Sequence, residues 1–169
     1  MALFKSIDTL DDLFAGTLRT TFYAEKEITK ALPKMIDKAN NPELRAGFEQ
    51  HLRETENQVR RLEEVFRLRG ESPNADTCPA IDGIIKAGDS TAGDISDPEV
   101  RDAALASAAQ MVEHYEIAQY GTMIAWAREL GRDDCAQILQ QTLQEEKATD
   151  QKLTDIAESR INRRAEAVS

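Results

Sequence analysis

Apolar residues recur every three or four positions over four long stretches of the chain, and this periodicity constrains the fold more than any other feature. The stretches cover residues 9–38, 42–69, 98–130 and 132–163. The spacing places the apolar side chains along one face of an α-helix. Helices of this length, ~45 Å, can bury such faces only against one another. The sequence therefore predicts an all-α four-helix bundle, formed by residues 1–169 as a single domain.

The connections between the stretches predict the order of the helices. Asn41-Pro42 and Asp97-Pro98 are typical of helix starts, whereas Gly70 and Gly131 indicate helix ends. The first and last pairs of helices are joined by a few residues, so each pair should be antiparallel. Residues 70–96 form one long crossover, which is typical of the ferritin-like bundle. Residues 79–87 of this crossover could form a short fifth helix.

Composition and charge exclude several classes of protein. The formal net charge of -10 disfavours nucleic acid as a partner, because an acidic surface repels phosphates. No apolar run approaches the ~18 residues that a membrane helix needs, and residues 1–10 lack the pattern of a secretory signal. We therefore expect a cytoplasmic protein that needs no membrane. Cys78 and Cys135 form no CxxC motif and are expected to be reduced thiols, with a disulfide or redox pair as the alternative.

Acidic residues occupy the apolar face of each predicted helix, close to its middle. Glu113 and Glu116 are three residues apart, and Glu146 and Asp150 are four apart, so each pair lies on one face of its helix. His51 lies on the apolar face of the second helix. The candidate metal ligands from the four helices are Glu25, His51, Glu54, Glu113, Glu116, Glu146 and Asp150.

Six carboxylates in a bundle core cannot all remain ionised without a cation. Desolvation costs several kcal/mol per ion, and like charges in one site favour protonation. Either some of the acids are protonated or metal ions supply positive charge. An oxygen-rich site with an imidazole suits iron, manganese or zinc. We expect two metal ions, with iron as the first choice and manganese or zinc as alternatives.

Some of these assignments leave an alternative open. Glu25 could instead form a surface ion pair, and His51 could support a ligand rather than bind the metal. The helical phase favours Glu146 over its neighbour Glu145, whereas a faint internal repeat pairs Glu145 with Glu54. Three tyrosines are expected to be packing residues, although one could hydrogen-bond a ligand: Tyr23, Tyr115 and Tyr120.

Four ordered segments resemble those of the YciE/YciF family of ferritin-like, stress-associated bacterial proteins. The resemblance extends over about residues 7–157, and its segments are Tyr23-Ala24-Glu25-Lys26, residues 49–55, Glu113-His114-Tyr115-Glu116 and residues 145–153. It implies a bundle related to the rubrerythrin di-iron domain, a homodimer, and a cytoplasmic bacterial protein. It implies no settled reaction.

The sequence departs from the wider ferritin-like superfamily at the usual Glu-x-x-His motifs. The second helix has the reverse order, His51-x-x-Glu54, and the fourth has Glu146-x-x-Thr149 followed by Asp150. Because the fourth helix lacks the usual histidine, a larger share of the candidate ligand atoms are oxygens. Metal identity and the transfer of oxidase or peroxidase chemistry are therefore both in question.

The favoured function is that of a dimetal carboxylate protein handling peroxide, oxygen or ferrous iron under stress. Whether it is an enzyme is left open. Glu25 and Glu113 would be terminal ligands, Glu54 and Glu146 bridges, and the remaining candidates would complete the shell. The alternative is a non-catalytic stress or scaffold protein whose metal is structural or absent. A mini-ferritin cage that protects DNA is disfavoured by the acidic charge.

Overall fold

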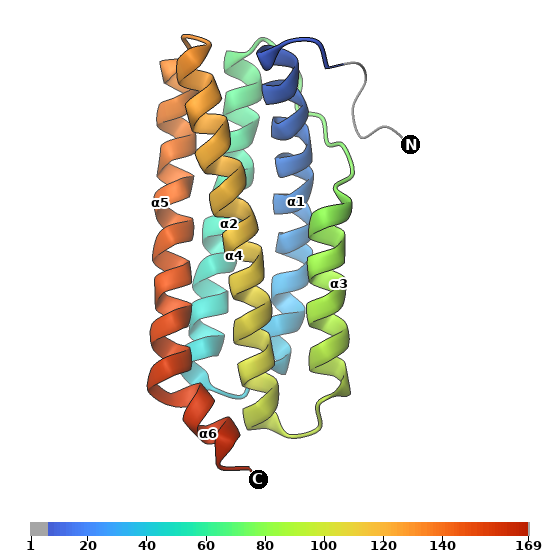
Figure 1. Cartoon of the computed structure of the whole chain (residues 1–169), viewed down its shortest axis with the longest axis vertical. Helices are drawn as coiled ribbons and strands as arrows, with labels where there is room; N and C mark the ends of the chain where they lie inside the picture. The colour runs from blue at the N-terminus through green and yellow to red at the C-terminus, as the bar shows by residue number, and fades with distance from the viewer. Residues whose placement is uncertain (1–6, 169) are drawn as a thin grey trace.

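Four long helices stand side by side in the computed structural model, which describes residues 7–168 (Figure 1). They are α1 (Leu10–Lys38), α2 (Pro42–Leu68), α4 (Pro98–Glu129) and α5 (Asp133–Ile156). A fifth helix, α3 (Pro79–Asp94), packs along the outside against α1 and α4. No strand occurs among the described residues. This is the predicted all-α, ferritin-like bundle.

Local sequence explains where the long helices begin. Thr9 and Asp12 form a reciprocal capping box at the start of α1. The side chain of Asn41 accepts hydrogen bonds from two backbone N–H groups of α2, at 2.9 and 3.2 Å. Asp97 does the same for α4, at 2.8 and 3.1 Å. These caps satisfy N–H groups that have no partner within the helix.

The crossover sets the direction of α4. The chain leaves α2 at Gly70, whose positive φ of 73° suits a residue without a side chain, and descends the length of the bundle through α3. As a result α2 and α4 run in the same direction, while α1 and α5 run opposite to them (Figure 1). The extra helix α3 reaches Asp94, seven residues beyond the predicted 79–87, because Gly88 and Ala92 are also buried by packing.

The last helix ends earlier than predicted. Instead of one helix to residue 163, α5 stops at Ile156 and is followed by a π-helical turn (Ala157–Ile161) and a short helix, α6 (Asn162–Glu166). The apolar residues of the π turn, Ala157 and Ile161, remain buried. The turn thus keeps the chain on the core while its hydrogen-bond pattern changes. Periodicity alone does not reveal such a change.

The hydrophobic core consists of two clusters, one in each half of the bundle. The first includes Ile28, Leu32, Phe48, Leu105 and Leu153. The second includes Phe14, Leu18, Leu62, Phe66 and Leu139. Between them, the middle of the bundle is left to polar side chains.

The two cysteines lie in different clusters, Cys78 in the first and Cys135 in the second, and both are free thiols. The alternative of a disulfide is therefore wrong. None of the described helices combines the length and hydropathy needed to cross a bilayer. The prediction about a secretory signal rests partly on residues 1–6, which lie outside the described part of the chain.

Candidate metal centre

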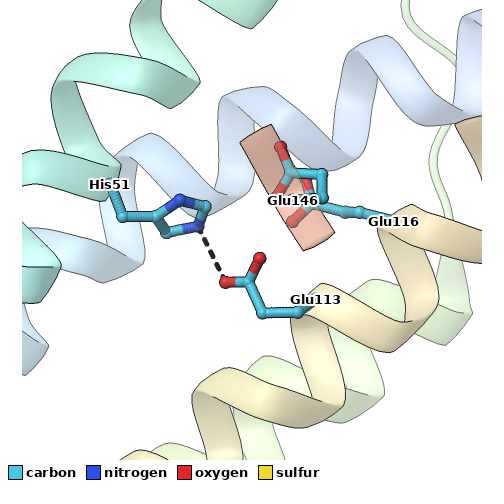
Figure 2. Close-up of side chains that lie close together, drawn as sticks. All are labelled: His51, Glu113, Glu116 and Glu146. Carbon is cyan, nitrogen blue, oxygen red and sulfur yellow. Dashed lines mark ion pairs between the residues drawn. The ribbon is translucent and has the colours of Figure 1, made fainter. Parts of the chain in front are cut away.

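Three helices bring four potential metal ligands together at mid-height in the bundle (Figure 2). His51 comes from α2, Glu113 and Glu116 from α4, and Glu146 from α5. Each of the four residues offers one ligand atom, and these four atoms all lie within 4.8 Å of one another. The three glutamates are 0% exposed and His51 is 3% exposed. Because Glu113 and Glu116 are three residues apart, one turn of α4 supplies two carboxylates to the same point.

Several polar atoms of this cluster have no hydrogen-bond partner among the described residues. They are both carboxylate oxygens of Glu113 and of Glu116, Oε2 of Glu146 and Nδ1 of His51. Buried polar groups are normally paired, because leaving one unsatisfied costs ~1–3 kcal/mol. Unpaired carboxylate oxygens directed toward one another match the ligand preference of iron, manganese or zinc. The donor set therefore fits a metal site.

Burial governs the protonation of these groups in the absence of metal. It raises the pKa of Glu146 to about 7, and it raises the pKa values of Glu113 and Glu116 well above their usual range. Repulsion between the acids raises them further. Without a cation, the cluster would therefore retain protons near neutral pH. Metal binding would have to displace them.

His51 is the only nitrogen ligand of the cluster. Its Nε2 lies 3.1 Å from Oε1 of Glu113 (Figure 2). Burial lowers the pKa of His51 to about 4, so the imidazole is neutral at physiological pH. The neutral ring is the form that binds metal. Its contact with Glu113 is consequently not an ion pair between full charges.

Glu25 of α1 lies beside the four-residue cluster and is 0% exposed. The hydroxyl of Tyr120 donates a hydrogen bond to its Oε1, and Oε2 has no partner among the described residues. Burial, followed by repulsion from Glu146, raises the pKa of Glu25 to about 8. The alternative of a surface ion pair for Glu25 is wrong. Tyr120 is the tyrosine that bonds a candidate ligand.

The remaining two candidates, Glu54 and Asp150, are only half-buried and lie at the edge of the cluster. Glu54 accepts a hydrogen bond from Gln50 at 2.8 Å. Asp150 contacts the exposed His114, with Oδ1 of Asp150 3.3 Å from Nε2 of His114. Glu54 raises the pKa of Glu146, and Asp150 raises that of Glu113, so both are close enough to influence the cluster.

The choice between Glu145 and Glu146 follows from their neighbours. Glu145 faces outward into a two-bonded ion pair with Arg61, at 2.6 Å for each bond. Glu146 faces the cluster and accepts a hydrogen bond from Gln58. Gln58 also donates to Glu145 at 3.1 Å, so it joins the two acids. The structure therefore places Glu146, the residue that helical phase favours, in the cluster.

Gln58 is a residue of the site that the sequence analysis missed. It is 0% exposed and lies on the buried face of α2, three residues after Thr55 and four before Leu62. A polar residue at a core position is the same signal that identified the acids. Gln58 could have been found by applying that test to amides as well as to carboxylates.

Two cavities reach His51 and Glu113 from different sides. The larger, about 310 Å³, lies between α1, α3 and α4 and is lined mainly by apolar residues. The smaller, about 120 Å³, lies between α2 and α5 and includes Glu54 and Lys152. The buried cluster is thus approached from two sides of the bundle.

A family model described as a domain of unknown function, DUF892, matches residues 9–166. The chain belongs to the DUF892 family. Protein YciF of Escherichia coli K12 is 41% identical to this DUF892 protein over 162 residues, which are 95% of this chain and 98% of YciF. The predicted family resemblance is confirmed.

Solved structures of similar proteins share the fold. The E. coli stress protein YciF matches with a TM-score of 0.87 and 41% identity, covering 92% of this chain and 99% of that one. YcfI from Rhodopseudomonas palustris matches with a TM-score of 0.87 and 53% identity, covering 89% and 96%. A protein from Xanthomonas campestris pv. campestris, at 23% identity and a TM-score of 0.71, matches over 89% and 92% and shows the fold alone.

Proposed function

We propose that this protein is a dimetal carboxylate protein that handles peroxide, oxygen or ferrous iron under stress. The observation that supports it is the buried cluster of His51, Glu113, Glu116 and Glu146, in which every carboxylate oxygen except Oε1 of Glu146 lacks a hydrogen-bond partner among the described residues. The three acids of this cluster, together with Glu25, need positive charge or protons in a buried core. The name of E. coli YciF, a stress protein, supports the connection to stress.

The proposed ligands of two ions are the seven predicted residues. Glu25 and Glu113 would be terminal ligands and Glu54 and Glu146 bridging ones, while His51, Glu116 and Asp150 would complete the set. Glu54 and Asp150 lie at the edge of the cluster and would turn inward from their contacts with Gln50 and His114. Iron is the proposed metal, with manganese or zinc as alternatives.

The chain's own residues would orient the ligands and exclude water. Tyr120 holds Glu25 by a hydrogen bond, and Gln58 holds Glu146. Such partners fix the direction of carboxylate ligands and tune their basicity. The two apolar clusters above and below the site limit the access of solvent. Bound redox-active metal would supply the electron-transfer chemistry.

Metal analysis tests the site directly. Protein purified without chelator should contain about two equivalents of transition metal, since oxygen and imidazole donors bind such ions. Glu146→Gln should reduce the metal content to about one equivalent or less. Exposed Glu49→Gln is the matched control on α2 and should retain the full content. Equal metal content in both variants would contradict the proposed site.

Stopped-flow spectroscopy tests the redox role. Anaerobically iron-loaded protein should show an absorbance change on mixing with peroxide or air, together with loss of the oxidant. Glu146→Gln should lose most of this response, while Glu49→Gln should keep it. No absorbance change and no consumption of oxidant by fully iron-loaded protein would contradict redox activity.

A non-catalytic role for the metal is the second candidate, favoured by the position of the cluster between the two halves of the core. An ion at this level would connect α2, α4 and α5 and stabilise the bundle. A large rise in melting temperature on metal binding, without any oxidant consumption, would favour this candidate over the first.

A homodimer in the cytoplasm is the proposed state of the protein. The family resemblance supports the dimer, and two free buried thiols are typical of a reducing compartment. The net charge of -10 supports a function that does not involve nucleic acid. Light scattering coupled to size-exclusion chromatography should give about twice the chain mass of 18.9 kDa. A mass of twelve or more chains would instead indicate a cage.

A further inference from the structure

The larger cavity extends from the candidate metal centre toward the end of the bundle where α1 ends. Its inner end is lined by His51 and Glu113, and its lining continues along α1 from Ile28 to Lys38. These eleven residues of helix span a length of ~15 Å. The volume of about 310 Å³ is within the range of small-molecule sites. The cavity is thus elongated, and one end of it meets the cluster.

The packing of α3 creates this cavity. Gly88 lets α3 approach α4 so closely that a Cβ atom at this position would lie 2.7 Å from the Cβ of Ala108. Contacts to α1 are made on either side of Gly88: the Tyr23 hydroxyl donates to Asp82 at 2.9 Å, and Lys38 pairs with Asp89 at 2.6 Å. The cavity lies between these two contacts, and residues of α4 form its third wall.

The chemistry of the lining changes along the length of the cavity. The middle is apolar and is formed by Ile28, Leu32, Met35, Ile85, Leu105 and Val112. The outer end has the exposed ammonium groups of Lys34 and Lys86 together with the Lys38–Asp89 pair. The inner end meets the acidic cluster, and two further acids of the lining, Glu27 and Asp82, precede the lysines along α1 and α3. An anion is therefore attracted to the outer end and repelled from the inner one.

We propose that the cavity binds a straight-chain monocarboxylate of medium length, with its carboxylate at Lys34 and Lys86 and its chain directed toward His51 and Glu113. Since 310 Å³ holds roughly ten water-sized groups, a chain of roughly eight to ten carbons fits. The binding site depends only on the cavity. The further idea that the bound carboxylate is a substrate of the metal centre rests on the proposed function.

Calorimetric titration of decanoate, below its micelle concentration, into metal-free and metal-loaded protein tests the binding. Affinity should fall about fourfold for each methylene removed between decanoate and hexanoate, because the cavity buries the chain. Decanol should bind more weakly than decanoate, and decylammonium more weakly still. Equal affinity for the three head groups, or no dependence on chain length, would overturn the proposal.

Substitutions within the cavity locate the site. Val112→Trp, which occupies part of the cavity from α4, should weaken decanoate binding at least about tenfold. Met111→Trp is the matched control, because Met111 is the neighbouring residue and 45% exposed. Ala31→Phe fills the cavity from α1 and provides a second variant if Val112→Trp does not fold. Unchanged affinity in a folded cavity variant would overturn the proposal.

The position of the ligand's carboxylate and the direction of its chain can be tested by separate measurements. Lys34→Ala together with Lys86→Ala should weaken decanoate but not decanol. With Mn²⁺ bound, the terminal methyl protons of decanoate should relax faster than those beside its carboxylate. Faster relaxation of the protons beside the carboxylate would overturn the proposal. Loss of decanoate binding at high protein concentration would also overturn it, because it would show that a second copy of the chain covers the cavity.

The failure of this inference can be distinguished from failure of the proposed function. Decanoate binding to metal-free protein, without oxidant consumption by the iron-loaded form, would support the cavity and contradict the redox role. Oxidant consumption without decanoate binding would contradict the cavity inference alone.

Discussion

Individual acids in this protein differ sharply in their surroundings although they are close in sequence. Glu145 and Glu146 are adjacent, yet Glu145 pairs with Arg61 and Glu146 is buried beside other carboxylates. The first is stabilised by a nearby cation, whereas the second can be ionised only at the expense of desolvation and repulsion. Burial and partner, rather than residue type, therefore decide which acid is available to a metal.

The stability of metal-free protein should consequently decrease as pH rises from about 5 to about 8. The pKa values of Glu25 and Glu146 are raised from 4.5 to about 8 and about 7, so the unfolded chain loses protons that the folded protein keeps. Rising pH then favours unfolding. His51, whose pKa is lowered from 6.5 to about 4, acts in the opposite direction below pH 6.5, but it is a single group.

Urea denaturation in the presence of chelator, at pH 5, 6.5 and 8 and constant ionic strength, measures this trend. Glu116→Gln removes one of the buried acids and should flatten the decrease. A stability that stays constant or rises over this range in the unmodified protein would show that the buried acids are not protonated.

At the level of elements, α3 depends on one close approach to the bundle. Gly88 and Ala108 are in contact where α3 crosses α4, whereas the position of Gly83, also in α3, has open space around it. A helix with small residues at its contact can approach its neighbour closely, but it tolerates little added volume there. The location of α3, and with it the wall of the larger cavity, is therefore sensitive to this pair.

Gly88→Ala should lower the free energy of unfolding by about 1–3 kcal/mol, because its new methyl group overlaps Ala108. Gly83→Ala is the matched control and should be neutral or stabilising by up to about 1 kcal/mol, since alanine favours helix. Combining Gly88→Ala with Ala108→Gly should recover part of the loss. Equal effects of the two single substitutions in urea denaturation would contradict the close packing.

At the level of the whole molecule, a layer of buried polar side chains in the middle of the bundle divides the hydrophobic core into two clusters. His51, Glu113 and Glu146 connect α2, α4 and α5 at this level. In the metal-free protein the layer weakens the middle of the bundle, because buried acids lack partners there. A bound cation would satisfy the same oxygens and stabilise the folded state alone.

Metal loading should therefore raise the melting temperature. A free metal concentration of about 100 times Kd contributes ~2.7 kcal/mol per site, which corresponds to roughly 5–10 °C for a domain of this size. Differential scanning calorimetry with Mn²⁺, and again after chelation, measures the shift. Glu146→Gln should reduce it and Glu49→Gln should not. The absence of any shift for unmodified protein at saturating metal would contradict a site between the helices.

The four long helices, and the height at which acids occur along them, could be predicted from local sequence alone. Helix periodicity and caps such as Asn41 and Asp97 depend on residues only a few positions apart, so they can be derived locally. The long crossover also followed, because its length allows α2 and α4 to be parallel. The π turn after Ile156 did not follow, since it preserves the apolar pattern.

Which of the acids meet depends on the packing of the helices and could not be predicted from local sequence. That packing placed Glu146 in the cluster and Glu54 at its edge, and it brought Gln58 and Tyr120 against Glu146 and Glu25. It also created the cavity beside α3. These features depend on how each helix is rotated and how closely it approaches its neighbours. Contacts between residues some 90 positions apart in the sequence fix those quantities, and local periodicity does not contain them.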